Sequence, residues 1–418
     1  MSAPNSEPDR EDAELTAVVH DAAEIVTIEA DGSLGIYEDA AIAVVDGEVA
    51  RIGATGPVTR EYSPEDAQFA VDATGKAVIP GFIDPHTHAL FAGDRSDEFE
   101  AKLQGKTYQE ILAEGGGILR TVRAVREASD EELLSNLLSH LDTMLAHGTT
   151  TVEIKSGYGL DTETELQMLD VIARADDQHP VEVIPTFMGA HAIPEGRDAD
   201  DYVDEVVEEQ IPAVAEQGIA QFCDVFCEEG VFSVEQSRRV LEAGKEHGMT
   251  PKVHAEELAH IGGTQLAAEL DATSADHLLY ATQEDIDAVV ESGVVPVLLP
   301  GTAFGLGAEF ADARAFLDAD APVAIATDFN PNCYSQSMGF AASLSCVEMG
   351  ITPKESLVAG TKHAGMALDM ADGAGTLQPG TAGDIAVLDA PSYVHVPYNF
   401  GVNTVETVLK NGQVVHRA

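Results

Sequence analysis

Short apolar runs alternate with helix-capable segments through the middle of this chain. Eight of these runs are interpreted as strands, because they are short, rich in apolar or small residues and bounded by polar ones. They cover residues 79–83, 149–154, 181–185, 222–226, 252–254, 273–275, 294–299 and 323–326. Eight β–α repeats within roughly 300 residues predict a closed (β/α)8 barrel of the TIM type. An open doubly wound sheet is the competing fold, although no G-x-G-x-x-G motif follows a strand.

The best-marked helix follows Ser129. Ser129 and Glu132 have the spacing of a capping box. Leucine and methionine recur at helical spacing from Leu133 to Leu145, and Gly148 is typical of a residue just past a helix end. The pattern predicts one long helix that leads directly into the next strand.

Both chain ends show short strand patterns without a long helix. Asp46 and Gly47, and likewise Asn411 and Gly412, separate two apolar runs, which favours hairpin turns. We therefore expect one small β-sandwich domain built from both ends of the chain. The predicted division is a disordered acidic tail at 1–13, the β-sandwich at 14–78 and 376–418, and the barrel at 79–375.

Acidic residues dominate the charge of the chain. The 73 Asp and Glu residues against 22 Lys and Arg give a formal net charge of −51, which argues against nucleic acid as a partner. Such a charge repels itself at low salt, whereas at 1 M salt the Debye length is only about 3 Å. We hypothesise a salt-rich cytoplasm, as in a halophile; an acidic protein of ordinary cytosol is the alternative.

No apolar run has the length of a membrane span, and no signal-peptide pattern precedes the first strand, so we expect a cytoplasmic protein that does not bind membranes. The chain has four cysteines. Cys223 and Cys227 are four residues apart, which is not a C-x-x-C motif. Free thiols are therefore predicted in place of a disulfide framework.

His86 and His88 follow the apolar run at 77–83, which is interpreted as one buried strand. Side chains two apart on a strand point to the same face, so the two imidazoles are spaced to bind one metal ion. Neutral imidazoles suit zinc or iron. A surface histidine pair on a polar turn is the alternative interpretation.

Three further candidate ligands, His254, His277 and Asp328, each come where a predicted strand ends. The carboxyl ends of barrel strands converge on one face, where active sites are built. The sequence therefore predicts one mononuclear metal site. The alternative for His277 taken alone is a capped core histidine, and for Asp328 taken alone a helix N-cap.

The motifs resemble those of the amidohydrolase superfamily and, more closely, of the imidazolonepropionases of histidine breakdown. Lys-Ser-Gly-Tyr-Gly-Leu-Asp at 155–161 and Phe-Met-Gly-Ala-His-Ala at 187–192 carry the closer resemblance, whereas H-x-H marks only the superfamily. The matching stretches are residues 80–88, 93–95, 115–118, 153–161, 186–192, 252–254, 274–278 and 326–331.

The resemblance implies a metal-dependent hydrolase and assigns roles to particular residues. One Zn²⁺ or iron ion (Fe³⁺ or Fe²⁺) per chain is implied, with a homodimer and a small-molecule substrate. The implied metal ligands are His86, His88, His254 and Asp328. The implied substrate contacts are Arg95, Tyr158, His191 and Glu257, with Asn330 on the opened product. The sequence departs from the family pattern at Asn332 and Cys333, where a backbone contact can remain at the first but a hydroxyl contact is lost at the second.

The implied reaction is hydrolysis of the lactam C–N bond of 4-imidazolone-5-propanoate to N-formimidoyl-L-glutamate. The leaving nitrogen needs a proton, and Glu257 and His277 both remain candidates to supply it. Asp328 is a further acceptor for a proton of the water. The guanidinium of Arg95 matches a carboxylate, although a surface ion pair with Asp94 or Asp97 also explains it.

Three other functions remain open. One is an aminohydrolase acting on a nucleobase, which would release ammonia. Another is a two-metal cyclic amidase, in which a carboxylated Lys155 would bridge the metals; an ion pair is the commoner fate of such a lysine. The third is a non-catalytic barrel scaffold.

Overall fold

The computed structural model describes residues 14–106, 110–111, 114–371 and 373–418, so the predicted tail at 1–13 lies outside the described residues. The chain divides into two compact units. The terminal unit contains the described residues up to Pro80, Thr376–Tyr393 and Val405–Ala418, and the barrel unit contains Gly81–Gly375 and Val394–Thr404. Residues 394–404 therefore belong to the barrel unit, where α17 (His395–Tyr398) packs against α14 (Met338–Glu348).

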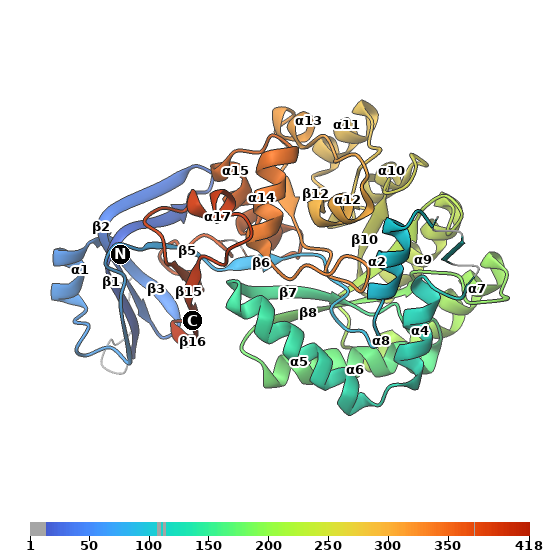
Figure 1. The fold of residues 1–418 in the computed structure, drawn as a ribbon, viewed down its shortest axis with the longest axis horizontal. Helices are drawn as coiled ribbons and strands as arrows, with labels where there is room; N and C mark the ends of the chain where they lie inside the picture. The colour runs from blue at the N-terminus through green and yellow to red at the C-terminus, as the bar shows by residue number, and fades with distance from the viewer. Residues whose placement is uncertain (1–13, 107–109, 112–113, 372) are drawn as a thin grey trace, which may run out of the picture. The chain divides into compact units, whose positions relative to one another are not determined.

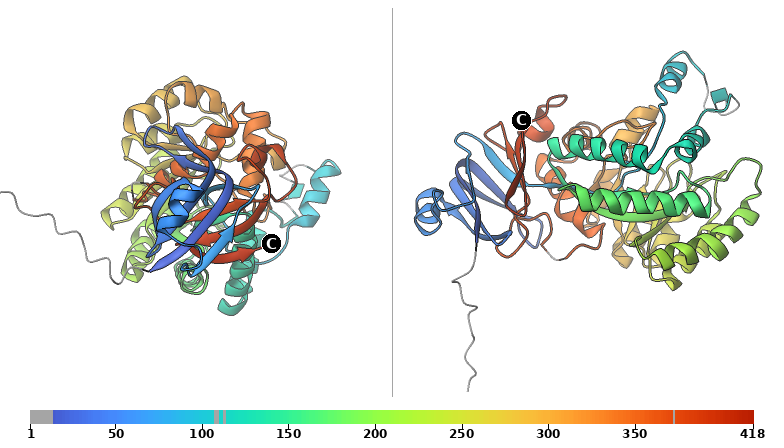
Figure 2. Two further views of the ribbon diagram at one scale, coloured as in Figure 1. Left: turned by 90° about the vertical axis from the view of Figure 1, so that its left-hand side faces the viewer. Right: turned by 90° about the horizontal axis from the view of Figure 1, so that it is seen from below.

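The terminal unit is one eight-stranded sheet in the order β16-β15-β14-β5-β1-β2-β3, with β4 also paired to β1. The strand β5 joins the two chain ends, because it pairs with β1 on one side and with β14 on the other. Figure 2 shows the early strands in blue beside the late strands in red. The strands are β1 (Leu15–Ile28), β2 (Leu34–Val45), β3 (Glu48–Ala54), β4 (Phe69–Asp72), β5 (Ala77–Pro80), β14 (Ile385–Leu388), β15 (Val405–Lys410) and β16 (Gln413–Arg417), and α1 spans Thr55–Glu61.

Both predicted hairpins are confirmed. Asp46 and Gly47 connect β2 to β3 with φ of 50° and 84°, and Asn411 and Gly412 connect β15 to β16 with φ of 49° and 74°. Two successive positive φ angles give the turn a twist that matches the flanking strands, and Asp, Asn and Gly adopt this conformation most readily.

The barrel unit contains eight parallel strands in sequence order, β6 to β13. The first and last strands meet through a bridge between Thr87 and Phe329, the bond from His88 N to Phe329 O (2.9 Å) and the bond from Asp328 N to His86 O (3.1 Å). This seam closes the sheet, so the predicted (β/α)8 barrel is confirmed and the open sheet is excluded. The strands are β6 (Phe82–Asp84), β7 (Thr149–Lys155), β8 (Glu182–Ala190), β9 (Phe222–Cys227), β10 (Thr250–Ala255), β11 (Ser274–His277), β12 (Val295–Leu298) and β13 (Ala324–Ile325).

Helices surround the barrel strands (Figure 1). The predicted long helix is α5 (Asp130–Ala146), with Glu132 N donating to the Ser129 hydroxyl at its start and Gly148 at φ 93° after its end. The other helices of this unit are α2 (Ser96–Leu103), α4 (Ile118–Glu127), α6 (Thr162–Gln178), α7 (Ala199–Glu205), the π-helix η2 (Val206–Gln210), α8 (Ile211–Gln217), α9 (Val234–Glu246), α10 (Gly263–Glu269), α11 (Gln283–Ser292), α12 (Pro300–Leu306), α13 (Ala313–Asp318), α15 (Pro353–Ala359) and α16 (Lys362–Met366).

The apolar run at 77–83 is not the single strand that its composition suggests. It divides at Gly81 into β5 of the terminal sheet and β6 of the barrel. A Cβ atom at Gly81 would lie 2.5 Å from the Thr150 side chain, so only glycine fits there. Both strands are buried, so both consist mainly of apolar residues, and the hydrophobic pattern does not show where one ends and the other begins.

All four cysteines are free thiols, as predicted. Among the described residues, no helix combines the length and the apolar character needed to cross a membrane.

Candidate metal centre and active site

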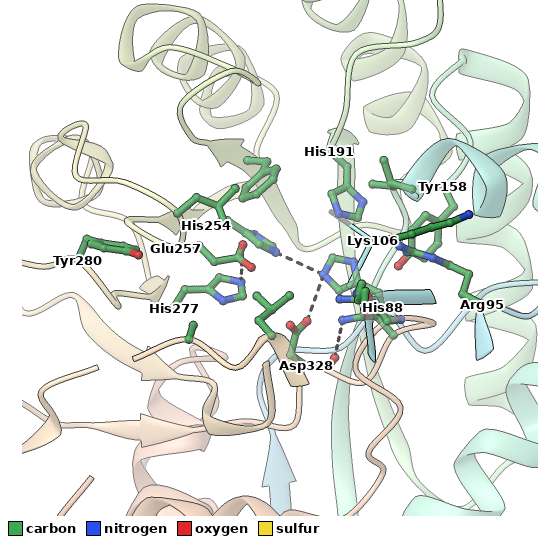
Figure 3. A pocket seen from close by; sticks show the side chains of 18 residues that line it. His88, Arg95, Lys106, Tyr158, His191, His254, Glu257, His277, Tyr280 and Asp328 are labelled. Carbon is green, nitrogen blue, oxygen red and sulfur yellow. Dashed lines mark hydrogen bonds and ion pairs between the residues drawn. The ribbon is translucent and has the colours of Figure 1, made fainter. Parts of the chain in front are cut away.

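The predicted site residues gather at the carboxyl ends of the barrel strands, around a cavity of about 590 Å³ (Figure 3). His88 follows β6, His191 follows β8, His254 lies in β10, His277 ends β11 and Asp328 follows β13. The cavity is lined by His88, Arg95, Lys102, Lys106, Ile118, Tyr158, His191, Phe226, His254, Glu257, Leu258, His277, Tyr280, Leu306, Ala308, Asp328, Asn330 and Asn332.

The four residues proposed as metal ligands converge on one point. Ligand nitrogens of His86, His88 and His254 all lie within 4.8 Å of one another, and the Nε2 atoms of His88 and His254 are 3.3 Å apart. Oδ1 of Asp328 lies 3.6 Å from Nε2 of His86 and 3.7 Å from Nε2 of His88. Three imidazoles and one carboxylate at this spacing match the ligand types of zinc and iron.

Two buried carboxylates orient the histidines. Nδ1 of His86 lies 2.6 Å from Oδ2 of Asp276, and Nδ1 of His254 lies 3.0 Å from Oδ2 of Asp224. At His86 the hydrogen bond to Asp276 places the proton on Nδ1 and leaves the Nε2 lone pair free for a metal. At His254 the Asp224 carboxylate favours a proton on the same atom. Nε2 of His86 is buried and has no hydrogen-bond partner among the described residues, so a cation at this point fits the site.

Burial sets the protonation of the cluster. It lowers the pKa of His86 and of His88 well below the ordinary histidine value, which keeps both imidazoles neutral, the form that binds metals. Burial alone would raise the pKa of Asp224, but contacts with His254 and Lys155 hold it well below its ordinary value. The orienting group is therefore a carboxylate.

A layer of buried charges supports this arrangement. Nζ of Lys155 lies 2.8 Å from Glu153 and 2.7 Å from Asp224, and all three side chains are fully buried. Burial would lower the pKa of Lys155, but the neighbouring carboxylates raise it above its ordinary value. Lys155 is therefore held in ion pairs with the carboxylates of Glu153 and Asp224.

Two of the predicted site residues have a positive φ angle, which is uncommon in residues other than glycine. His277 has φ 81° and Asp328 has φ 51°. Such conformations persist where the surroundings enforce them, and they concentrate at functional sites. The Asp328 carboxylate also accepts a hydrogen bond from the Thr302 hydroxyl, which orients it.

His191 and Tyr158 line the cavity beside the cluster (Figure 3). The His191 ring stacks on His88 at a centroid distance of 4.7 Å, and its Nδ1 donates to Gly157 O (3.0 Å). Burial lowers the pKa of His191 to about 3, so the ring is neutral. Burial also raises the pKa of Tyr158, whose phenol stays protonated and able to donate. Gly157 is required, because a Cβ would lie 2.8 Å from Met188 O.

Arg95 also lines the cavity, and its Nε donates to Oε2 of Glu98 (2.9 Å). Both side chains are largely buried, so this is not the surface pair with Asp94 or Asp97 that the sequence left open. Asp97 pairs instead with Arg120. Glu98 was missed from the sequence, although its position three residues after Arg95, at the start of α2, is a spacing at which side chains can pair.

Glu257 and His277 lie together, with Oε2 and Nε2 3.7 Å apart. Burial, with the nearby charge of Asp328, raises the pKa of Glu257 to about 8, whereas burial lowers the pKa of His277 well below its ordinary value. Glu228 accepts hydrogen bonds from the backbone N–H of Glu257 (3.0 Å) and Leu258 (2.9 Å), which fixes this loop.

The loop after β13 places the last predicted residues. The Asn330 side chain donates to Asp328 O (2.7 Å) and accepts from the N–H of Asn332 and Cys333, so it stabilises the turn as well as lining the cavity. Asn332 lines the cavity. Cys333 does not, because its thiol is buried 3.6 Å from Thr327 O.

The model of the amidohydrolase family matches residues 77–415. The chain is 72% identical over 403 residues to the imidazolonepropionase of Haloarcula marismortui, covering 96% of each chain. This chain belongs to the imidazolonepropionase family. The imidazolonepropionase of Halobacterium salinarum is 61% identical over 96% of this chain and 98% of its own. That of Geobacillus kaustophilus is 47% identical over 91% of both.

Solved amidohydrolase-type structures share the fold of this imidazolonepropionase family member. A zinc-bound adenosine deaminase from Xanthomonas campestris superposes with a TM-score of 0.74 at 18% identity, covering 96% of this chain and 93% of its own. Escherichia coli guanine deaminase superposes with a TM-score of 0.73 at 14% identity, covering 97% and 99%. At these identities the likeness concerns the fold alone.

Proposed function

We propose that this protein hydrolyses the lactam C–N bond of 4-imidazolone-5-propanoate to N-formimidoyl-L-glutamate in L-histidine catabolism. The near-full-length identity with imidazolonepropionases carries this proposal. The cavity supports it, because it combines a histidine cluster with cationic side chains suited to a ring that bears a carboxylate.

One zinc or iron ion per chain is proposed, held by His86, His88, His254 and Asp328. The free Nε2 of His86 and the two orienting carboxylates support this assignment. When bound, such a cation lowers the pKa of a water molecule from about 15.7 to about 7 and polarises a carbonyl oxygen.

Glu257 is proposed to move the proton. In the reaction, the water oxygen bonds to the ring carbonyl carbon, the C–N bond breaks, and the nitrogen gains the proton that the water loses. A carboxyl group with a pKa of about 8 exchanges a proton readily near neutral pH. His277, neutral and 3.7 Å away, is proposed to donate a hydrogen bond to the reacting carbonyl.

The remaining predicted residues are proposed to bind the substrate. The Arg95 guanidinium, fixed by Glu98, has further N–H donors for the propionate carboxylate. Tyr158 and His191 offer a phenol donor and an imidazole to the ring. Asn330 and Asn332 line the side of the cavity where the opened product is expected.

The experiment is to supply the metal-loaded protein with imidazolone propionate and to follow loss of the ring chromophore, ammonia release and metal content. Ring opening without ammonia, at one metal per chain, supports the proposal. Ammonia release would favour an aminohydrolase, and two metals per chain would favour a cyclic amidase. A metal-free protein without turnover would favour a scaffold.

We also propose a salt-rich cytoplasm as the working environment. The net charge of −51 and the high identity with proteins of the halophiles Haloarcula marismortui and Halobacterium salinarum support this. Thermal melts are expected to shift upward between about 0.1 and about 3 M KCl, because salt screens the repulsion between carboxylates. An unchanged melting temperature across this series would contradict the proposal.

A homodimer is proposed through an uncharged surface of the barrel unit. Residues 329–347 and 394–404 of this unit contain no Asp, Glu, Lys or Arg, in a chain with 73 acidic residues. Tyr398 (73% exposed), Phe400 (73%) and Val402 (69%) are large exposed apolar side chains of this surface. Two copies of a chain with a net charge of −51 repel each other, so they can associate only through a surface without carboxylates. This favours a second copy of the chain as the partner that covers this surface.

Light scattering in about 3 M KCl, a concentration chosen to screen the charge, is expected to give the mass of a dimer. Phe400→Glu is expected to give the mass of a monomer. A monomeric wild-type chain would rule out this surface as a dimer contact.

A further inference from the structure

The wall of the cavity holds an unusual concentration of positive charge. The chain has only 22 Lys and Arg among 418 residues, yet Arg95, Lys102 and Lys106 all line this one cavity. Two of the three are paired with carboxylates. Arg95 contacts Glu98 (2.9 Å), and Lys106 contacts Glu114 (2.7 Å).

Lys102 differs from the other two. Its Nζ donates to Oδ1 of Asn332, which is a neutral amide. Among the residues that the structure describes, no carboxylate lies within ion-pair distance of this ammonium group. Lys102 is only partly exposed, so water does not fully compensate its charge. With Arg95 and Glu98 beside it, this part of the wall keeps one net positive charge.

A partly buried charge without a counter-ion is unfavourable, so a ligand group of the opposite charge would stabilise it. The ammonium group has three N–H donors, and Asn332 accepts only one hydrogen bond from it. Asn332 therefore orients the ammonium group and leaves two donors for the cavity. A ligand carboxylate that contacts both groups would be held by Arg95, the N-cap residue of α2, and by Lys102, in the last turn of that helix.

We infer that Lys102 is a specificity-determining residue that binds the carboxylate of the substrate side chain together with Arg95. This inference rests on the proposed function and extends it, because it predicts that a ring without the carboxylate is a poor substrate. The hydrogen bond to Asn332 makes the loop after β13 part of the same subsite.

The test compares two compounds, imidazolone propionate and its propionamide, which has the same shape without the charge. Lys102→Met is expected to lower kcat/KM for the carboxylate compound roughly 10- to 100-fold, mainly through KM. The amide, scored as a substrate or as a competitive inhibitor, is expected to change by less than about threefold. Lys102→Arg, which keeps the charge, is expected to restore most of the loss.

Equal losses for the acid and the amide would overturn the inference, because Lys102 would then act only by tethering Asn332. An unchanged kcat/KM for the acid would overturn it as well. These outcomes are distinct from failure of the proposed function, in which the wild-type protein would open neither ring and both proposals would fall.

Discussion

Replacing Glu257 with glutamine is expected to lower kcat about 10²–10⁴-fold, the usual range for loss of a proton-transfer group. Glutamine has the same shape but cannot hold and release a proton at this position. The loop is expected to keep its place, since Glu228 binds the backbone N–H groups of residues 257 and 258 and not the side chain. Steady-state kinetics on metal-loaded protein measures the effect.

Metal content and melting temperature of Glu257→Gln are expected to equal those of the wild type, because Glu257 is not among the proposed ligands. Glu284→Gln, an exposed glutamate on α11, is the matched control and is expected to keep full activity. A kcat of Glu257→Gln within about threefold of the wild type would shift the proton-transfer role to His277.

Lys155→Met is expected to destabilise the fold by about 3–5 kcal/mol, the usual cost of removing one partner from a buried ion pair. Lys155 is the cation between Glu153 (2.8 Å) and Asp224 (2.7 Å), and it lies 3.9 Å from Asp276. Its loss leaves the buried Asp224 carboxylate without its lysine partner, whereas Glu153 keeps Lys252 at 3.3 Å. Urea unfolding in concentrated KCl measures the change in the free energy of unfolding.

Lys245→Met is the matched control, because Lys245 is an exposed lysine whose Nζ donates to Leu270 O (2.8 Å) and pairs with Asp271 (3.3 Å) at the surface. A surface pair of this kind contributes little, so a change within about 0.5 kcal/mol is expected. Equal effects of the two substitutions would show that the buried network does not stabilise the barrel. Lys155→Met is also expected to weaken metal binding, because Asp224 and Asp276 orient His254 and His86.

Local patterns were sufficient for much of the fold and for the candidate ligands. The hairpins at Asp46 and Asn411 follow from turn residues that adopt positive φ, and α5 follows from a cap and an apolar stripe. The H-x-H pair and the strand-end residues were found because every parallel strand of a closed barrel ends on the same face.

The orienting carboxylates were missed, although a weak signal was present. Asp224 and Asp276 interrupt short apolar or small-residue strands, and a charged residue inside such a strand needs a buried partner. The sequence does not show which residue that partner is. Asp276 and His86 are 190 residues apart, and Lys102 and Asn332 are 230 apart, so no local spacing relates them.

The sequence by itself determined the element types, the order of the barrel strands and the residue types at the strand ends, because these depend on periodicity and turn chemistry within a few residues. Only the tertiary structure decided that the run at 77–83 divides at Gly81, that Arg95 pairs with Glu98, and that Lys102 contacts Asn332 and no carboxylate of the described residues. One physical reason is that buried strands of different sheets have the same apolar composition, so the sequence does not show where one ends and the next begins. The other is that charged side chains pair with whichever residues the closed barrel brings beside them, and these are distant in the sequence.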